Sequence, residues 1–181
     1  TGHKNLELLF QQAVEFKPRY VLIQDQLLAQ VLRQRLHSLE IKTTVLSKTT
    51  DLSYLAAHPE VDIVMSAIVG SAGLIPTYQA AIHGKRILLA NKESMVAAGK
   101  LITDAVAANN ASLIPVDSEH SAIFQALPFG YSNLNDAGVN KIILTASGGP
   151  FLNTSYAELQ QVTAAQAIKH PNWSMGQKIS V

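Results

Sequence analysis

The chain has 181 residues, of which 48% are hydrophobic and 15% are charged. This is enough apolar surface to fold a core, which excludes a disordered tail or a linker. Fourteen basic and thirteen acidic residues give a net charge of +1 without a basic block, so binding of nucleic acid or an acidic membrane through a charged face is not expected. Cysteine is absent, which excludes disulfides, thiolate metal sites and a cysteine nucleophile.

Helical and extended segments alternate through the first part of the chain. Leu6, Leu9, Phe10, Ala13 and Val14 recur at helical spacing, between a capping Asn5 and Pro18. Short apolar or β-branched runs predict buried strands. We expect helices over residues 5–15, 25–37, 51–57, 76–83 and 94–108, and strands over residues 20–23, 43–46, 61–69, 86–90 and 113–116.

Strands separated by helices are typical of parallel βαβ units and predict an α/β fold with a doubly wound, mostly parallel, Rossmann-like sheet. Such sheets bind ligands at the carboxyl ends of their strands. The usual opening strand and its G-x-G-x-x-G turn are not seen, and would lie upstream of Thr1. After Val116 the pattern changes: a helix is predicted over residues 118–126, a strand over 141–145, and short helices over 156–162 and 164–168. A second domain is therefore expected to begin near Asp117.

The triplet Asp117-Ser118-Glu119 follows the predicted strand 113–116. In a backbone that is still extended, the two carboxylates point the same way, and a cation between them would relieve their repulsion. Oxygen ligands favour Mg²⁺ or Mn²⁺ over zinc. The alternative is a solvated acidic turn, or Ser118 as a helix cap with Glu119 in the first helical turn.

The triplet Asn91-Lys92-Glu93 ends the strand 86–90, also at the binding edge. Lys92 could face a cofactor phosphate, a ribose or a developing alkoxide. The alternative is an exposed lysine paired with Glu93. Residues 70–73, with two glycines after a strand, form a weaker candidate for a phosphate loop and fit a plain strand-to-helix turn equally well.

Two further segments carry candidate binding residues. Residues 146–150 hold two glycines and Ser147, which suits an anion pocket or a tight turn. Residues 170–176 hold the single tryptophan, Trp173, between Pro171 and Gly176, which suits a mobile lid or a surface loop with Trp173 in the core. The other histidines are interpreted as structural, with His120 at most supporting a metal ligand.

Four ordered motifs together resemble the 1-deoxy-D-xylulose 5-phosphate reductoisomerase family. They are LANKES at residues 89–94, PVDSEHSAIFQ at 115–125, TASGGPF at 145–151 and HPNWSMGQKISV at 170–181. The resemblance spans essentially the whole chain. It implies an NADPH-dependent enzyme that uses Mg²⁺ or Mn²⁺ to convert 1-deoxy-D-xylulose 5-phosphate to 2-C-methyl-D-erythritol 4-phosphate, in the non-mevalonate route to isoprenoids.

The resemblance also implies roles for individual residues. Asp117 and Glu119 match metal ligands, and Lys92, Asp117, Glu119 and His170 match the catalytic centre. Ser118, Glu119, Ser147, His170 and Trp173 match substrate-binding positions. Lys4, Asn5, Asn91, Lys92, Glu93 and Gly176 match cofactor-binding positions, although His3 stands where the family usually has glycine.

The family's glycine-rich turn and its third metal carboxylate have no counterpart in this sequence. We therefore expect residues 1–116 to be an NADPH-binding domain without its first βα unit. Residues 117–181 are expected to be the first part of the catalytic domain, including the lid over residues 170–176. A central segment of this kind is expected to be inactive alone. For the full-length enzyme the resemblance implies a homodimer acting on a small sugar phosphate, without nucleic acid or membrane partners.

That enzyme would be cytoplasmic, or plastid-located in a plant or apicomplexan. Two other functions remain open. One is a metal-independent NAD(P)-dependent dehydrogenase of sugar phosphates or semialdehydes. The other is a non-catalytic, NADPH-binding regulatory domain.

Overall fold

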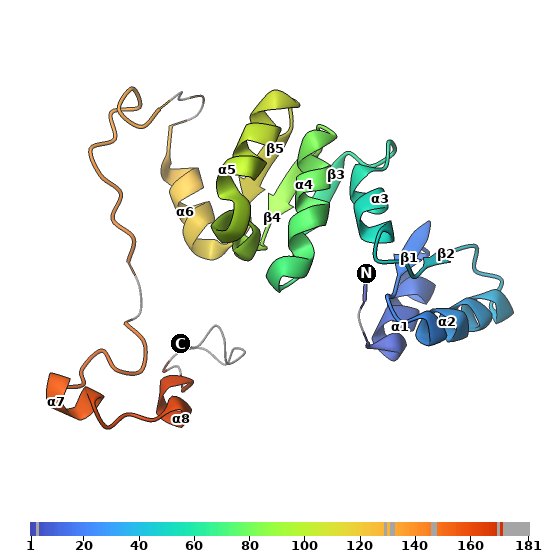
Figure 1. Ribbon diagram of the computed structural model, residues 1–181, viewed down its shortest axis with the longest axis horizontal. Helices are drawn as coiled ribbons and strands as arrows, with labels where there is room; N and C mark the ends of the chain where they lie inside the picture. Colours follow the sequence, from blue (N-terminus) through green and yellow to red (C-terminus); the bar gives the residue numbers. More distant parts are fainter. Residues whose placement is uncertain (3, 129, 131–132, 146–147, 170, 172–181) are drawn as a thin grey trace. The chain divides into compact units, whose positions relative to one another are not determined.

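The computed structural model describes residues 1–2, 4–128, 130, 133–145, 148–169 and 171. The chain divides into two compact units, Thr1–Ala126 and Leu127–Val181 (Figure 1). This division falls at the end of a helix, whereas the composition change lies near Asp117. The functional division at Asp117 remains a prediction, because compactness assigns no role to either part.

The first part of unit 1 is a pair of parallel strands with two helices. The elements are α1 (Leu6–Phe16), β1 (Tyr20–Leu22), α2 (Gln26–Ser38) and β2 (Thr44–Leu46), with Tyr20 opposite Thr44. Asn5 caps α1 by accepting a hydrogen bond from the Leu8 N–H, and Asp25 caps α2 in the same way. Asn5 thus caps its helix as predicted, whereas Asp25, expected as the first residue of the helix 25–37, is the cap that precedes α2.

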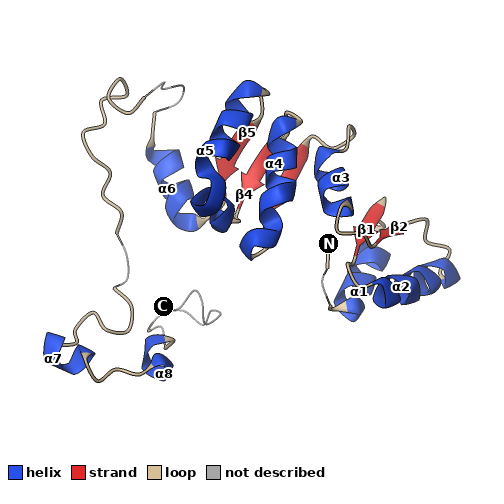
Figure 2. Cartoon of the chain, in the orientation of Figure 1, coloured by secondary structure: helices blue, strands red, loops and turns tan. Residues whose placement is uncertain are grey.

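The second part of unit 1 is a three-stranded parallel sheet in the order β3–β4–β5 (Figure 2). Its helices α4 and α5 lie next to each other along the sheet (Figure 1). The elements in chain order are α3 (Asp51–Ala57), β3 (Ile63–Ser66), the 3₁₀ turn η1 (Gly70–Gly73), α4 (Leu74–Ile82), β4 (Arg86–Leu89), α5 (Lys92–Ala108), β5 (Ser112–Pro115) and α6 (Ser118–Ala126). All the helices and strands predicted for this part are present. The ends of α3 and α6 are as predicted, and the other elements differ at one end or both.

The five strands form two sheets in the described part of the chain, and not the single sheet that the sequence predicts. An isolated parallel bridge pairs Gly2 with Ile23 on the far side of β1 from β2. Strand pairing joins residues that are distant in the sequence, and the local apolar pattern behind the prediction does not record it. The α/β class and the parallel pairing are confirmed.

Each sheet has its own apolar core. The first gathers side chains from α1, β1, α2 and β2, including the fully buried Ile23, Leu32 and Leu36. The second joins α3, α4, β4 and α5 around Ile87, with Ala80 and Ala81 in close contact. Small alanines let the helices approach the sheet closely, which holds the carboxyl ends of β4 and β5 in fixed register.

Unit 2 has little regular structure among its described residues. It contains α7 (Tyr156–Leu159) and α8 (Ala164–Ala167), each begun by a capping box, from Ser155 to Glu158 and from Thr163 to Gln166. Both predicted helices are therefore present but shorter. The strand predicted over residues 141–145 is wrong: these residues form no strand and are exposed, because no neighbouring strand accepts their hydrogen bonds within the described residues.

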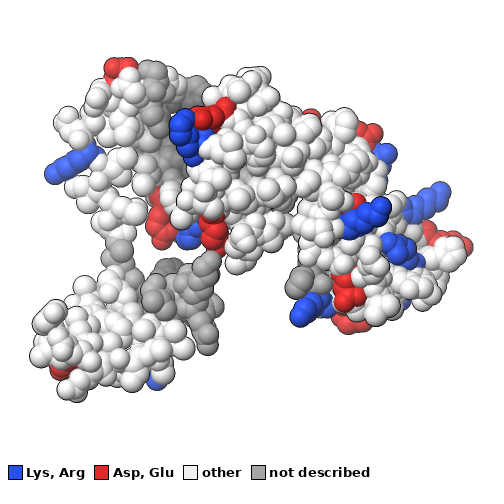
Figure 3. Space-filling view, viewed as in Figure 1, with Lys and Arg blue, Asp and Glu red and all other residues white. Residues whose placement is uncertain are grey.

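Charged side chains of both signs are interspersed on the face shown in Figure 3, in keeping with the net charge of +1. Among the described residues, no helix is long and apolar enough to cross a bilayer.

Candidate active site

The ends of β4 and β5 bring two of the sequence motifs together. The two strands are paired in parallel, with Leu89 opposite Pro115, and the Val116 N–H donates to the Leu89 carbonyl at 2.9 Å. After β4 the chain enters α5 at Lys92, and after β5 it enters α6 at Ser118. Lys92 and Asp117 consequently meet at the edge where parallel sheets bind ligands.

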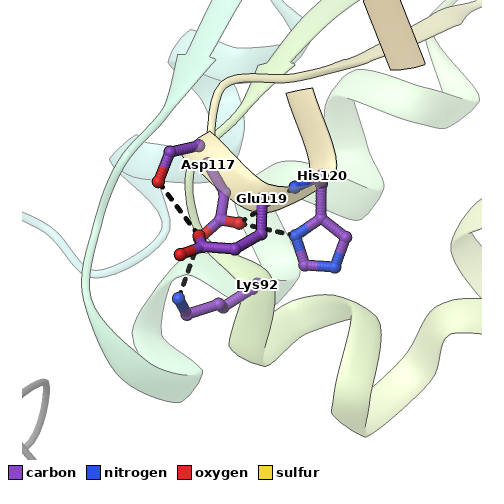
Figure 4. Close-up of polar contacts among 5 residues, drawn as sticks. Lys92, Asp117, Glu119 and His120 are labelled. Atoms are coloured by element: carbon purple, nitrogen blue, oxygen red, sulfur yellow. Dashed lines mark hydrogen bonds and ion pairs between the residues drawn. The ribbon is translucent and has the colours of Figure 1, made fainter. Parts of the chain in front are cut away.

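Both carboxylate oxygens of Asp117 are engaged (Figure 4). Oδ2 accepts a hydrogen bond from Lys92 Nζ at 2.8 Å. Oδ1 lies 2.7 Å from His120 Nδ1 and 3.4 Å from the His120 N–H. Because an ionised carboxylate only accepts, His120 Nδ1 must carry the proton of this contact. The carboxylate is thus fixed between a cation and an imidazole.

The segment from Asp117 to Glu119 is not the continuous extended backbone that the sequence predicts. The Asp117 carbonyl accepts from the Ser121 N–H at 2.8 Å, so the chain already turns into α6. Asp117 occupies the capping position, and Ser118 and Glu119 lie in the first helical turn. The alternative of Glu119 in the first turn is therefore correct, although Asp117 and not Ser118 is the cap. Side-chain capping outcompetes strand continuation here, since the unpaired N–H groups of α6 need an acceptor.

Electrostatics keep Lys92 and Asp117 charged. The hydrogen bond from Lys92 lowers the pKa of the Asp117 carboxyl well below its usual range; the contacts of His120 add to this, while partial burial opposes it. In turn, the hydrogen bond to Asp117 raises the pKa of Lys92, with smaller contributions from the charges of Asp117, Glu119 and Glu93. The Asp117 side chain is 12% exposed and that of Lys92 55%, so the pair is open to solvent on the lysine side.

The donor set fits a hard divalent cation. Asp117 and Glu119 offer carboxylate oxygens from the start of one helix, and the Ser118 hydroxyl donates to Glu119 Oε2 at 3.0 Å. In this structure the Lys92 ammonium supplies the positive charge that balances the Asp117 carboxylate. The described residues include no group of three or more side chains able to hold a metal, so these two carboxylates would form part of a coordination shell.

The candidate cofactor-binding residues lie in two regions of the sequence. Asn91, Lys92 and Glu93 lie at the start of α5, beside Asp117, and Asn91 is almost fully buried. Lys4 and Asn5 lie at the start of α1, where the Asn5 side chain serves as the cap. Within the described part of the chain, no hydrogen bond or ion pair joins Lys4 or Asn5 to Lys92. Ser147, His170, Trp173 and Gly176 lie outside the described residues, so their assignments remain predictions.

Sequence reasoning missed two features of this site. The contact of His120 with Asp117 follows from their spacing of three residues, which places both on one turn of α6. The burial of Asn91 is signalled by Ser94, three residues later, a spacing typical of helix capping. Gly148 and Gly149 both have positive φ, which agrees with the sharp turn predicted for residues 146–150.

Comparisons with known proteins agree with the resemblance. The family model described as 1-deoxy-D-xylulose 5-phosphate reductoisomerase matches residues 1–99, and the model of its C-terminal domain matches residues 113–181. The reductoisomerase of Glaesserella parasuis is 50% identical over 99% of this chain and 47% of its own length. That of Saccharophagus degradans is 52% identical over 100% of this chain and 46% of its own length. The chain thus spans about half the length of these curated relatives.

Solved structures give the same result. A crystal structure of DOX-P reductoisomerase in complex with NADPH, fosmidomycin and magnesium has a TM-score of 0.87 and 41% identity, over 99% of this chain and 45% of that one. The Zymomonas mobilis reductoisomerase in complex with NADPH has a TM-score of 0.84 and 39% identity, over 94% of this chain and 43% of that one. The chain therefore belongs to the 1-deoxy-D-xylulose 5-phosphate reductoisomerase family.

Proposed function

We propose that this chain is part of an NADPH- and divalent-metal-dependent reductoisomerase that converts 1-deoxy-D-xylulose 5-phosphate to 2-C-methyl-D-erythritol 4-phosphate, a precursor of isoprenoids. The observation that carries the proposal is the meeting of Lys92 with Asp117, at the ends of adjacent parallel strands, in a chain of this family. A solved relative in complex with NADPH, fosmidomycin and magnesium supports the choice of cofactor, cation and substrate class.

Asp117 and Glu119 would hold Mg²⁺ or Mn²⁺. When bound, the cation supplies Lewis-acid stabilisation of negative charge on substrate oxygens. His120 keeps the Asp117 carboxylate in one orientation by its contact with Oδ1, while Oδ2 faces the Lys92 ammonium. Ser118, one residue along, would bind a substrate oxygen through its hydroxyl.

The Lys92 side chain would lie where the cofactor and the substrate meet. Its raised pKa keeps the ammonium charged at neutral pH, so it donates hydrogen bonds and attracts anionic oxygens of phosphate or substrate. Glu93, Lys4, Asn5 and Gly176 are proposed to bind NADPH, which supplies a hydride when bound. Asn91 stands next to Lys92 at the start of α5. Ser147, His170 and Trp173 are proposed to bind substrate, with residues 170–176 closing over it to exclude water.

The assembly and location are proposed from the resemblance alone: a homodimer of the full-length enzyme, in the cytoplasm for a bacterial source. Residues 1–116 would bind the cofactor, and residues 117–181 would begin the catalytic domain. This segment is proposed to be inactive by itself.

The test uses a full-length reductoisomerase that contains this sequence. NADPH oxidation is followed with 1-deoxy-D-xylulose 5-phosphate, the product is identified by mass, and the assay is repeated after chelation. We expect turnover that chelation abolishes and Mg²⁺ restores. Turnover that survives chelation would indicate a metal-independent dehydrogenase. NADPH binding without turnover, whatever the metal, would indicate a regulatory domain.

A further inference from the structure

The hydrogen-bonding groups of the Asn91 side chain all have partners within the protein. Asn91 is 2% exposed and stands between the end of β4 and Lys92, the first residue of α5. Oδ1 accepts from the Ser94 N–H at 2.9 Å and from the Ser94 hydroxyl. Nδ2 donates to the Gly70 carbonyl at 2.9 Å and to the Ile68 carbonyl. Both amide hydrogens and the carbonyl oxygen therefore have partners.

Helix capping explains only half of these contacts. A serine, threonine or aspartate could accept the Ser94 N–H and begin α5 equally well. Only a side chain that carries an acceptor and two donors on one planar group can also bind the carbonyls of Ile68 and Gly70. The amide therefore fastens the turn after β3, residues 68–73, to the start of α5.

Gly73 shows that the turn approaches Asn91 too closely for any side chain. A Cβ at this position would lie 2.7 Å from Asn91 Nδ2 and 2.8 Å from the Ile68 carbonyl oxygen. The φ of Gly73 is −80°, a value open to every residue, so glycine is needed here for space and not for backbone freedom.

The turn is anchored from its other side by two buried hydroxyls. Thr77 Oγ1 donates to the Gly73 carbonyl at 2.6 Å. Its proton is used there, so Ser66 Oγ must donate in the 2.6 Å contact between the two hydroxyls. In addition, the Asn91 N–H donates to the Ser66 carbonyl at 2.9 Å. The end of β3, residues 68–73 and the start of α5 are thereby joined in one buried polar network.

We infer that Asn91 and Gly73 form a clamp that positions Lys92, with Asn91 acting through Lys92 and not as a side-chain ligand of the cofactor. The clamp fixes where α5 begins, and the first residue of α5 carries the ammonium that binds Asp117. Buried, mutually satisfied polar groups hold such a geometry because every alternative leaves one of them unpaired. The inference rests on the proposed function for its catalytic meaning, whereas the clamp itself is testable without turnover.

The first test is Asn91→Asp in the full-length enzyme without cofactor. Aspartate keeps the acceptor for Ser94 but replaces the donors that bind the carbonyls of Ile68 and Gly70. The matched control is Asn109→Asp at the other end of α5, where Nδ2 donates to the Ala105 carbonyl at 2.8 Å. Hydrogen exchange is measured on peptides that cover residues 68–75. We expect exchange to rise at least about tenfold in Asn91→Asp, the effect of leaving at least one of the two carbonyls unpaired, and to stay unchanged in the control.

The second test asks whether Asn91 acts through Lys92. The kcat and the Kd for NADPH are measured for Asn91→Asp, Lys92→Met and the double variant. We expect Asn91→Asp to lower kcat about tenfold in the parent and to have little further effect once Lys92 is replaced. Equal losses in both backgrounds would overturn the inference. So would unchanged exchange at residues 68–75 in Asn91→Asp, because a direct cofactor ligand would alter NADPH binding without loosening the cofactor-free turn.

If Asn91→Asp does not fold, Asn91→Ser takes its place in both tests, since serine caps a helix and also lacks the two donors. Absence of turnover in the parent enzyme would contradict the proposed function and leave the exchange test to decide on the clamp.

Discussion

The ammonium of Lys92 lies 2.8 Å from Oδ2 of Asp117, across the ends of two adjacent parallel strands. One residue begins α5 and the other caps α6, so two helix starts are tied together by a single ion pair (Figure 4). The contact therefore links Lys92, which is proposed to bind the cofactor, with Asp117, which is proposed to bind the cation.

Replacing Lys92 by Met should raise the pKa of Asp117 toward its ordinary value, since the largest cause of its lowering is removed. The pKa of folded Asp117 lies below its unfolded value of about 3.9, so the pair stabilises the fold above that pH and loses its effect as the pH falls through the folded pKa. The acid limb of the stability profile should therefore move to higher pH in Lys92→Met.

The measurement is the carboxyl titration of Asp117 by NMR, together with the pH dependence of unfolding. Lys100→Met is the matched control, because Lys100 pairs with Asp104 on the exposed face of the same helix. An Asp117 titration that is identical in Lys92→Met and in the parent would show that the ion pair does not form in solution.

Gly73→Ala should destabilise the protein by about 1–3 kcal/mol, the usual cost of inserting a carbon into packed surroundings. The added Cβ meets Asn91 Nδ2 and the Ile68 carbonyl, and the backbone carbonyl cannot rotate away. Gly99→Ala on α5 is the control: its nearest atom is Met95 Cε at 3.7 Å, so this change should stabilise by about 0.5–1 kcal/mol. Urea unfolding measures both. Equal effects of the two substitutions would refute the close approach at Gly73.

Asn5 combines a structural contact with a proposed cofactor contact, and two substitutions separate them. Asn5→Ala should cost about 1 kcal/mol of stability, because the Leu8 N–H loses its acceptor. Asn5→Asp keeps the cap and should leave stability nearly unchanged, yet weaken NADPH binding by charge repulsion. Thermal unfolding and NADPH titration distinguish these outcomes. If Asn5→Asp binds NADPH as tightly as the parent, Asn5 does not contact the cofactor and serves only as a helix cap.

Local signals in the sequence predicted most of unit 1. The cap Asn5 and the apolar periodicity of α1 act over a few residues, so they can be identified without knowing the fold. The positions of Lys92 and Asp117 at strand ends were predictable in the same way, because parallel strands end at a common edge.

The features that could not be predicted depend on partners distant in the sequence. Strand pairing is non-local, so the separation of β1–β2 from β3–β4–β5 and the lack of a strand at residues 141–145 were not visible in any window. The burial of Asn91 was not predicted either, because its partners Ile68 and Gly70 lie on another turn, 23 and 21 residues away in the sequence.

The most direct test of the central proposal, that Asp117 and Glu119 serve the cation while the cofactor binds elsewhere, is a pair of titrations on Asp117→Asn and Glu119→Gln in the full-length enzyme. Mn²⁺ binding is measured by electron paramagnetic resonance and NADPH binding by fluorescence, with Asp104→Asn on the exposed face of α5 as control. We predict at least about tenfold weaker Mn²⁺ binding and lost turnover in both site variants, with NADPH affinity within about twofold of the parent and the control unchanged. Undiminished Mn²⁺ binding and full activity in either variant would remove that carboxylate from the metal site and contradict the proposal.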